Sequence, residues 1–486
     1  MVKDIICRRI NVRFEFFFGL LRDFMKSVMS KENTAKELGT ASIGRLLIQY
    51  SLPAIIATAA SSIYNIVDRI FIGQGVGPYA ISGLALTLPL MNIFAAFGAV
   101  IGVGSSTMVS IYLGQRNDED AVHTLGNAFV LNIILSIITS VFGYIFLDDI
   151  LMSMGASEMT LPYAREFMEI ALIGNLLIHI YLGLNHIMRA SGFPQKSMYI
   201  TLTTVAINIT LAPIYIFVFH WGIRGAALAT LCGQIVGTII VLHHFMNHEK
   251  PLHFAPGCFK LKGKIISNIF MIGLPNFVML LLASMVAVIM NRSLGKYGGD
   301  FAIGAFGIIN SLLNLIAMIV AGFTQGMQPI AGFNFGARNL DRVKQVFKLT
   351  LVCGSSVTIF GFLVSELFPR FISSLFTTDE QLIELAAFGL RIALAAFAIV
   401  GIQMVTSNFF QSIGRPKISL ILTMLRQLIF LIPTMLILPH IGNLGLTGVW
   451  LSMPVSDTLA ALATIGTLIY FVKVKKIFTN YEYKLK

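Results

Sequence analysis

Charged side chains are scarce in this sequence. Asp, Glu, Lys and Arg make up 12% of its 486 residues, whereas hydrophobic residues make up 56%. Soluble domains carry about 25% charged residues, so this deficit excludes an ordinary soluble domain and indicates a protein that crosses the bilayer many times. The net charge of +12 does not indicate a nucleic-acid partner. Most basic residues lie in short loops and at the two ends of the chain, which is how loop charges set a membrane topology.

Cysteine and the motifs of catalytic or metal sites are also scarce. The four cysteines, Cys7, Cys232, Cys258 and Cys353, show no CxxC spacing, and we expect them to be unpaired. No HExxH motif and no constellation of paired acids is found. These absences argue against an enzyme, a metal site and a bound cofactor.

Long apolar runs account for most of the chain. Twelve of them reach about 20 residues, the length that spans a bilayer as a helix. We therefore predict an all-α integral membrane fold with twelve transmembrane helices. The expected spans are 46–72, 80–112, 121–147, 163–188, 197–219, 223–247, 264–291, 301–335, 343–368, 382–412, 417–439 and 444–472.

Loop charges orient these spans. With the N-terminus in the cytoplasm, the inside segments hold 26 Lys and Arg, and the outside loops hold only Arg224, Arg292, Lys296 and Arg370. Short cytoplasmic loops carry an excess of basic residues. The sequence therefore predicts a multi-pass protein with both termini in the cytoplasm.

The two halves of the sequence repeat each other. Pro53 and Pro275 both follow a leucine and stand 222 residues apart. The same offset pairs residues in loops as well as in spans: Ser62 with Ser284, Gly73 with Gly295, Asn92 with Asn314, Gly104 with Gly326, Gly114 with Gly336, and Gly192 with Gly414. An even number of spans in each half gives both halves the same orientation, as in many secondary transporters with a substrate site between the repeats.

The repeat predicts a domain organisation. Residues 43–247 form an N-terminal six-helix bundle, residues 265–472 form a pseudo-symmetric C-terminal six-helix bundle, and the basic loop 248–264 links them in the cytoplasm. Residues 1–42 and 473–486 are cytoplasmic ends. Within the first, residues 1–28 follow the spacing of an interfacial amphipathic helix, but we favour an extension upstream of a start near Met29.

One acid stands inside the first span. The run 51–73 contains Asp68, and Tyr64 and Asn65 precede it on the same helical face. An ionisable side chain within a membrane costs roughly 2.5–3.5 kcal/mol on insertion scales, so it normally faces a protein interior or a water-filled path. The repeat places Met290 at the equivalent position. The coupling chemistry that such an acid suggests is therefore assigned to the N-terminal bundle.

Several motifs together resemble those of the MATE family of multidrug antiporters, in the bacterial branch typified by DinF and MepA. They are VDRIFIGQGVGPYAI (67–81), GVGSSTMVSIYLGQRNDEDA (102–121), GAALAT (225–230), TQGMQPIAGFNFGARNLDRV (324–343) and FQSIGRPKISLILTMLRQLIFLIP (410–433). The resemblance covers about residues 43–471. It implies two bundles arranged as a V in the cytoplasmic (inner) membrane of a bacterium. It also implies export of amphipathic, often cationic compounds, driven by the influx of protons or sodium.

The resemblance also implies roles for individual residues. Asp68 matches the family's acid of the first helix, Asn208 matches the asparagine of the fifth, and Thr230 ends the GAALAT-type motif. We expect Asp68 to couple the cation together with Tyr64, Asn208 and Thr230. The family's acid of the fifth helix is replaced here by Ala212. A sodium ion prefers several oxygen ligands including carboxylates, so this departure favours protons over sodium.

Two further charges stand in the last spans. Asp457 lies three residues after Pro454 and has Gln234 as its repeat partner. It binds a cationic substrate or a second proton, or else it caps a helix broken at the proline; both interpretations stay open. For Arg426, a structural pair with Asp457 or with helix carbonyls is favoured over contact with substrate.

These observations predict an ion-coupled antiporter that exports small organic, mostly cationic, molecules by alternating access and works as a monomer in the lipid bilayer. One alternative is a flippase for a lipid-linked precursor, which would need several basic residues in its cavity; only Arg426, Arg69 and Arg391 are candidates. A more remote alternative is a membrane-embedded enzyme.

Overall fold

The computed structural model describes residues 37–474 and 477–478, apart from the side chains of Pro78 and Asp300. The predicted interfacial helix or upstream extension within residues 1–28 lies outside the described residues. The α-helices are α2 (Glu37–Thr40), α3 (Ile43–Gly75), α4 (Pro78–Gly114), α5 (Asp118–Ile145), α6 (Leu147–Ser153), α7 (Leu161–Ala190), α8 (Pro194–Pro213), α9 (Gly222–Met246), α10 (Gly263–Gly336), α11 (Leu340–Leu367), α12 (Pro369–Ser374), α13 (Glu380–Ala393), α14 (Phe397–Ser412), α15 (Pro416–Met424), α16 (Ile432–Ile437) and α17 (Gly445–Ile469). Short π-helical or 3₁₀ turns are η1 (Ile214–Val218), η2 (Leu425–Leu431), η3 (Leu438–Asn443) and η4 (Tyr470–Val474).

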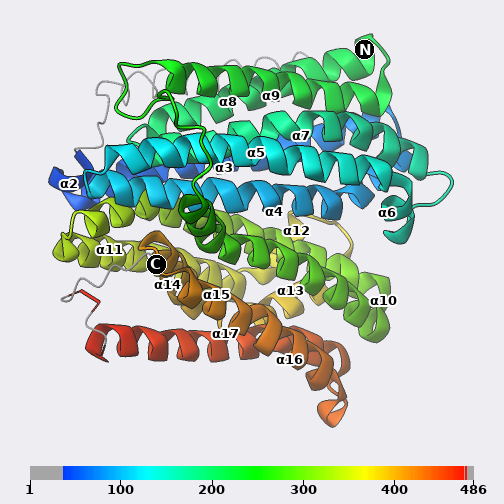
Figure 1. Ribbon diagram of the computed structural model, residues 1–486. Helices are drawn as coiled ribbons and strands as arrows, with labels where there is room; N and C mark the ends of the chain where they lie inside the picture. The colour runs from blue at the N-terminus through cyan, green and yellow to red at the C-terminus, as the bar shows by residue number, and fades with distance from the viewer. Residues whose placement is uncertain (1–36, 475–476, 479–486) are drawn as a thin grey trace.

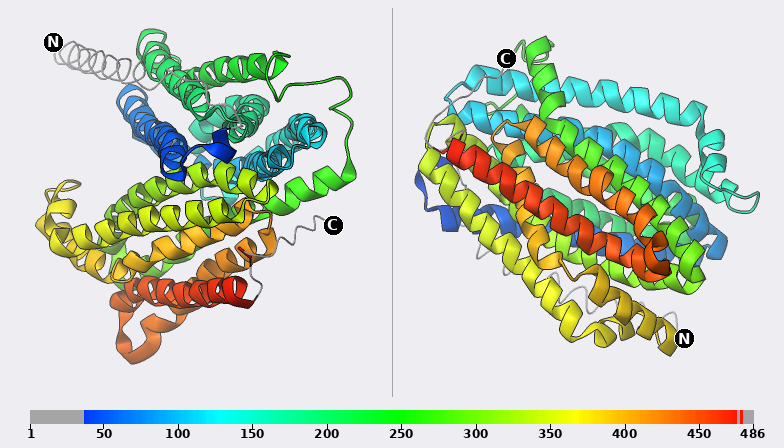
Figure 2. Two further views of the ribbon diagram at one scale, coloured as in Figure 1. Left: turned by 90° about the vertical axis from the view of Figure 1, so that its left-hand side faces the viewer. Right: turned by 90° about the horizontal axis from the view of Figure 1, so that it is seen from below.

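The predicted all-α fold with twelve spans is confirmed. Within the described residues, eleven helices are long and apolar enough to cross a membrane, and α13 with α14 forms a twelfth span that is bent by 56°. The long helix α10 is two spans, which meet at Gly299, where the backbone leaves the helical region. Figure 1 shows helices α3–α9 gathered on one side and α10–α17 on the other. The left view of Figure 2 shows the same separation.

The sequence repeat is also a repeat of backbone conformation. Left-handed residues recur at the same offset of 222: Gly77 with Gly299, Arg116 with Arg338, and Gly192 with Gly414. One residue later in phase, His220 corresponds to Asn443 and Gly222 to Gly445. A positive φ is uncommon outside glycine. Its recurrence at Arg116 (φ 58°) and Arg338 (φ 60°) therefore indicates that both halves turn between spans in the same way.

Hydrogen bonds inside the two bundles repeat as well. In the first, the Asn185 side chain donates to the carbonyl oxygen of Ser197 and to Oγ1 of Thr201, each at 3.3 Å. In the second, the hydroxyl of Ser407 bonds to the carbonyl oxygen of Ser419 and to Oγ1 of Thr423, each at 3.2 Å. These three positions correspond at the offset of 222. The fourth and fifth spans of each half are therefore held together by equivalent contacts.

The first turns of each half pack into the core of the other half. Leu46, Leu47 and Tyr50 at the start of α3 are buried with residues of the second span of α10, α11 and α14. Conversely, Ile265 and Ile269 at the start of α10 belong to the core formed by α4, α5 and α7. The predicted boundaries of the two bundles stay a prediction, but the packing of these helix starts crosses them.

The bundles approach most closely at one end of the molecule. This end carries α2, the loop 247–262 and the loops that follow α4, α7, α10 and α14, and we call it the basic end. Here α4 and α10 touch backbone to backbone: a Cβ atom on Gly104 would overlap the carbonyl of Ile269, and one on Gly336 would overlap the carbonyl of Ile111. Glycine permits this approach because it has no side chain. In Figure 1, α10 and α4 diverge from this end towards the other, as expected for a V.

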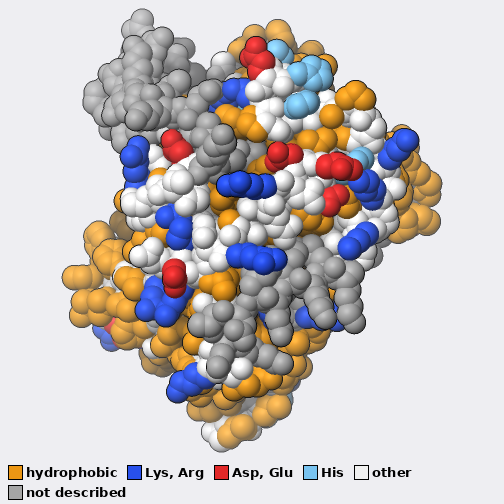
Figure 3. All heavy atoms as spheres, turned by 60° about the vertical axis from the view of Figure 1, so that its left-hand side comes forward, with side chains coloured by type: hydrophobic (Ala, Val, Ile, Leu, Met, Phe, Trp, Pro, Cys, Tyr) orange, Lys and Arg blue, Asp and Glu red, His pale blue; other side chains and the backbone are white. Residues whose placement is uncertain are grey.

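Basic side chains lie across the basic end, interspersed with acidic side chains and histidines, as Figure 3 shows. The loop 247–262 is fixed there to α5. The side chain of Asn127 donates to the carbonyl oxygen of Lys260 at 2.9 Å and accepts from the backbone amide of Lys262 at 2.9 Å. Within this loop Cys258 is buried, and burial raises the pKa of its thiol. The connection between the two halves is therefore a docked segment rather than a free tether.

Candidate functional site

The site is built around a cavity of about 460 Å³ on the inner side of the N-terminal helices. Helices α3, α7, α8 and α9 form its walls, and Gln325 of α10 reaches it from the other bundle. Its volume lies in the range of pockets that take small organic molecules. Polar side chains line it along its length, including both ends. Tyr64, Asn208 and Thr230 lie at one end, whereas Arg189 and Gln325 lie near the basic end.

Three of the four predicted coupling residues meet at the far end of this cavity. Tyr64 of α3 and Thr230 of α9 share a hydrogen bond of 2.9 Å between their hydroxyls. The side-chain amide of Asn208 on α8 donates to Oγ1 of Thr230 at 2.8 Å and more weakly to the hydroxyl of Tyr64 at 3.4 Å. We call these three residues the tyrosine cluster. It joins the first, fifth and sixth spans at one point, which sequence spacing alone does not establish.

Asp68 lies one helical turn beyond the tyrosine cluster on α3. Its side chain is 6% exposed. The Oδ1 atom is enclosed, and none of the described residues offers it a hydrogen bond. A carboxylate ion without partners in such surroundings is costly. The position therefore favours the neutral acid or a carboxylate that holds a cation.

The structure also describes Ala212, the position at which the family resemblance implies a second acid. Ala212 lies one turn after Asn208 on α8 and is fully buried. It is followed by Pro213 and the π-helical turn η1, so the helix changes geometry at this point. In place of a carboxylate, Ala212 contributes a methyl group to an apolar core.

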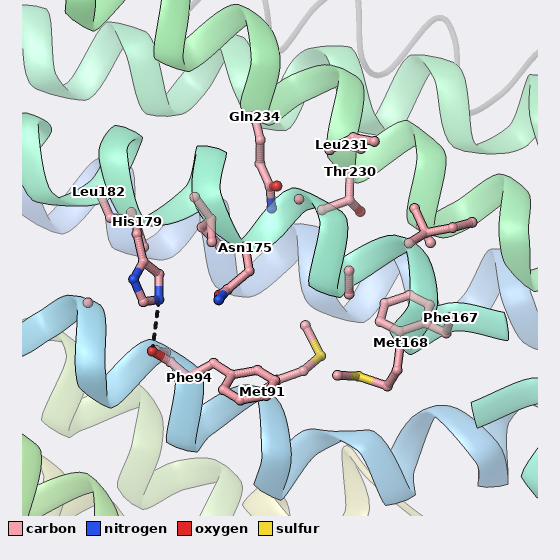
Figure 4. A pocket seen from close by; sticks show the side chains of 17 residues that line it. Met91, Phe94, Phe167, Met168, Asn175, His179, Leu182, Thr230, Leu231 and Gln234 are labelled. Atoms are coloured by element: carbon pink, nitrogen blue, oxygen red, sulfur yellow. Dashed lines mark hydrogen bonds between the residues drawn. The ribbon is translucent and has the colours of Figure 1, made fainter. Parts of the chain in front are cut away.

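A second, smaller pocket of about 80 Å³ adjoins the first between α4, α7 and α9. Figure 4 shows the sulfur and ring groups of Met91, Phe94, Phe167 and Met168 around it, with Thr230 and Gln234 on its far wall. His179 lines it and bonds through Nε2 to the carbonyl oxygen of Phe94 at 3.1 Å. Sequence reasoning missed His179, although a histidine within an apolar run was a signal for it.

The predicted second polar site divides between the two bundles. Arg426 on η2 donates from Nε to Oδ1 of Asp457 on α17 at 2.9 Å, and the side chains are 27% and 6% exposed. Helix α17 continues through Pro454, so the interpretation of Asp457 as a cap at a helix break is wrong. Gln234 lies on α9, where it lines both pockets of the N-terminal helices. Gln234 therefore lies apart from the Arg426–Asp457 pair, although Asp457 is its repeat partner.

Arg189 is a cavity residue that sequence reasoning assigned to a loop. Helix α7 extends to Ala190, so Arg189 lies in its last turn with its side chain towards the cavity. From there its guanidinium donates to Oε1 of Gln325 on the opposite bundle. The available signal was that Asn185 and Arg189, four residues apart, share one helical face.

Comparison with known proteins agrees with this arrangement. The MatE family model matches residues 53–214 and again residues 275–437. The multidrug export protein MepA of Staphylococcus aureus (strain NCTC 8325 / PS 47) is 30% identical over 431 residues, which cover 88% of this chain and 94% of that protein. MepA of Staphylococcus haemolyticus (strain JCSC1435) is 29% identical over 421 residues, or 87% and 92% of the two chains.

Solved structures show the same fold. A crystal structure of MATE in the bent conformation superimposes with a TM-score of 0.87 at 24% identity, over 93% of this chain and all of that one. An outward-facing conformation of a multidrug resistance MATE family transporter of the MOP superfamily gives 0.85 at 24% identity, over 92% of this chain and all of that one. Together with the double match of the family model, these likenesses show that the chain is a transporter rather than an enzyme and belongs to the MATE family of multidrug efflux proteins.

Proposed function

We propose that this protein is a proton-coupled antiporter that exports amphipathic, often cationic small molecules by alternating access. In this proposal the protein works as a monomer in the cytoplasmic membrane of a bacterium. The basic end and both termini face the cytoplasm, in keeping with the excess of Lys and Arg in its loops. Asp68 is the coupling acid, and the tyrosine cluster links it to the cavity.

The observation that carries the proposal is the unpartnered carboxyl oxygen of Asp68, one turn from a polar cluster that lines the cavity. A buried carboxyl group changes its charge when it gains or loses a proton, and the surroundings favour the neutral form. Protonation from one side and release to the other can therefore alternate with the binding of a cationic substrate. A gradient of 100–200 mV supplies about 2.3–4.6 kcal/mol per charge. That energy sustains a substrate gradient of roughly 50- to 2000-fold for one proton per neutral substrate.

Protons fit the residues around Asp68 better than sodium does. A sodium ion prefers several oxygen ligands, and the fifth span supplies the methyl group of Ala212 where a second carboxylate would stand. The nearby oxygens of Tyr64 and Thr230 are already engaged with each other at 2.9 Å. One carboxyl group with few partners is sufficient to carry a proton.

The other predicted polar residues take supporting roles in this proposal. Gln234 contacts substrate, because it lines both pockets beside Thr230. The Arg426–Asp457 pair is structural, because each charge is neutralised by the other at 2.9 Å. A coupling acid, by contrast, needs to be free to change its charge.

The test is transport by the purified full chain in liposomes under separately imposed proton and sodium gradients. Asp68→Asn should abolish gradient-driven uptake of a fluorescent organic cation, whereas Asp341→Asn, which removes an exposed acid at the start of α11, should leave it intact. Undiminished uptake by Asp68→Asn contradicts the proposed mechanism. Uptake driven by sodium alone contradicts the choice of proton.

A further inference from the structure

The cavity has a positively charged side chain, that of Arg189, at the end opposite the coupling acid. Arg189 lines the cavity in the last turn of α7, and His186, one turn earlier on the same helix, lines it too. Tyr64, Asn208 and Thr230 close the other end, with Asp68 one turn beyond them. Along α7 the cavity extends from Ile178 to Arg189, which is about 16 Å of helix. The lining is therefore polarised along its length, positive near the basic end and acidic beyond the far end.

Among the residues that the structure describes, the charge of Arg189 has no partner of opposite sign. Among the ion pairs that the described residues form, none includes Arg189, and its one hydrogen bond goes to the neutral amide oxygen of Gln325. A guanidinium has five N–H donors, so most of its donors are available to the cavity. A cation held within a membrane protein normally pairs with an acid or serves a function.

The corresponding position of the repeat carries no charge. The repeat partner of Arg189 is Gln411, at the same offset of 222. Its side-chain amide donates to the carbonyl oxygen of Ile272 at 2.7 Å, in the first span of α10 and therefore in the same half of the chain. A neutral glutamine is thus sufficient at the end of the corresponding span, where it bonds a backbone carbonyl of its own half. The positive charge of Arg189 is therefore available for a function other than a structural hydrogen bond.

The partner of Arg189 changes in an alternating-access cycle. Gln325 lies on α10 and Arg189 on α7, so separation of the bundles at the basic end breaks their hydrogen bond. An incoming carboxylate would replace the amide oxygen with a charge-assisted hydrogen bond, which is shorter and roughly twice as strong. When the bundles close again at this end, Gln325 returns and competes for the same donor.

We propose that Arg189, with His186 beside it, forms a subsite for an anionic group, so that the cavity prefers zwitterionic amphiphiles over cations of the same scaffold. This inference rests on the proposed transport function and names its substrate class. The anionic group of the substrate lies at Arg189, and the cationic group points towards Tyr64 and Asp68. The total charge of the occupied cavity is then balanced at both ends.

A matched pair of dyes separates this subsite from general binding. Tetramethylrhodamine carries a carboxylate and a delocalised cation, and its methyl ester keeps the cation and loses the carboxylate. Fluorescence polarisation with the purified full chain in a nonionic detergent gives a Kd for each dye without any ion gradient. In Arg189→Gln we expect the Kd of the acid to rise by about tenfold to a hundredfold, the usual range for hydrogen bonds to charged groups. The Kd of the ester should stay within about twofold.

Two further variants keep the test decisive if Arg189→Gln folds poorly. Gln325→Glu places a carboxylate beside Arg189, so it should weaken binding of the acid by competition and should not weaken binding of the cationic ester. Lys264→Gln removes an exposed charge at the start of α10 and should change neither dye.

The outcomes distinguish the inference from the function on which it rests. Equal weakening of acid and ester in Arg189→Gln would assign Arg189 to the contact between bundles alone. An unchanged Kd of the acid in both Arg189→Gln and Gln325→Glu would also overturn the subsite, although transport of the ester would still support the antiporter. Absence of binding of either dye to the wild-type chain would contradict both proposals.

Discussion

The two bundles have equivalent backbone conformations, but they carry different side chains at the coupling positions. At the offset of 222 residues, Tyr64 and Asp68 correspond to Val286 and Met290. At the later offset of 223, Asn208 and Thr230 correspond to Leu431 and Met453. The four counterparts lie together in one hydrophobic cluster, in which Met290 is 1% exposed. A polar cluster beside an unpartnered acid in one bundle is thus an apolar core in the other. The comparison teaches that the repeat preserves the geometry, while the coupling chemistry depends on a few side chains.

The buried charges of the second bundle differ in kind. Arg426 and Asp457 neutralise each other at 2.9 Å, and Asp457 corresponds to the neutral Gln234 in the first bundle. None of the described residues offers Asp68 such a partner. An acid that is paired keeps its charge, whereas an acid without a partner is free to exchange a proton. The difference separates a structural charge from a coupling charge.

The helices of the second bundle are also less regular. The span of α7 is continuous, whereas its counterpart bends by 56° between α13 and α14. The bend lies at residues 394–396 and contains neither proline nor glycine. After it, the hydroxyl of Thr358 on α11 donates to the carbonyl oxygen of Ala398 at 3.1 Å. A neighbouring side chain thus bonds the backbone next to the bend, as membrane proteins require.

Moving the acid from one bundle to the other tests the comparison most severely. In the double variant Asp68→Asn, Met290→Asp we expect no recovery of gradient-driven transport in liposomes, because Val286, Leu431 and Met453 cannot replace the tyrosine cluster. Met290→Asp alone should lower the free energy of unfolding by about 3–5 kcal/mol, as for a buried charge without a partner. Thermal unfolding in detergent measures this loss, with Met290→Leu as the control. Restored transport in the double variant would show that backbone equivalence is sufficient.

Breaking the paired charges should affect stability and spare coupling. Asp457→Asn leaves Arg426 without an anion, so we expect the free energy of unfolding to fall by about 3–5 kcal/mol. The double variant Arg426→Met, Asp457→Leu should lie closer to the wild type, because both charges leave together. The correctly folded molecules of each variant should still transport substrate when a proton gradient is imposed. Loss of coupling at unchanged stability would instead make Asp457 a second coupling acid.

Replacing one member of the tyrosine cluster by its counterpart should have the smallest effect. Asn208→Leu copies Leu431 of the second bundle and removes hydrogen bonds of 2.8 and 3.4 Å to Thr230 and Tyr64. We expect a loss of about 1–3 kcal/mol in the free energy of unfolding and a severalfold slower transport rate. Leu431→Ile, which conserves volume, should cost less than about 1.5 kcal/mol and leave the transport rate unchanged. An unchanged transport rate in Asn208→Leu would remove Asn208 from the site.

Much of the fold and part of the site could be predicted from the sequence. The twelve spans follow from hydrophobic length, and the repeat follows from residues such as Pro53 and Pro275 that keep one offset through loops. Asp68 stood out because an acid in an apolar run is costly. Asn208 and Thr230 entered only through resemblance to a family, since a single polar residue in a membrane helix does not indicate which neighbour it meets.

The sequence by itself thus determined the number of membrane spans, the two halves and an acid in the first span whose repeat partner is a methionine. Only the tertiary structure decided that the first turns of α3 and α10 are buried in the opposite core, that Arg189 faces the cavity, and that Asp457 pairs with Arg426. The physical reason is that lipid and protein interior are equally apolar. Ile138 and Phe142, both 57% exposed, read in the sequence like the fully buried Leu46. The sequence of a membrane helix therefore indicates its length, but not which of its faces meets another helix.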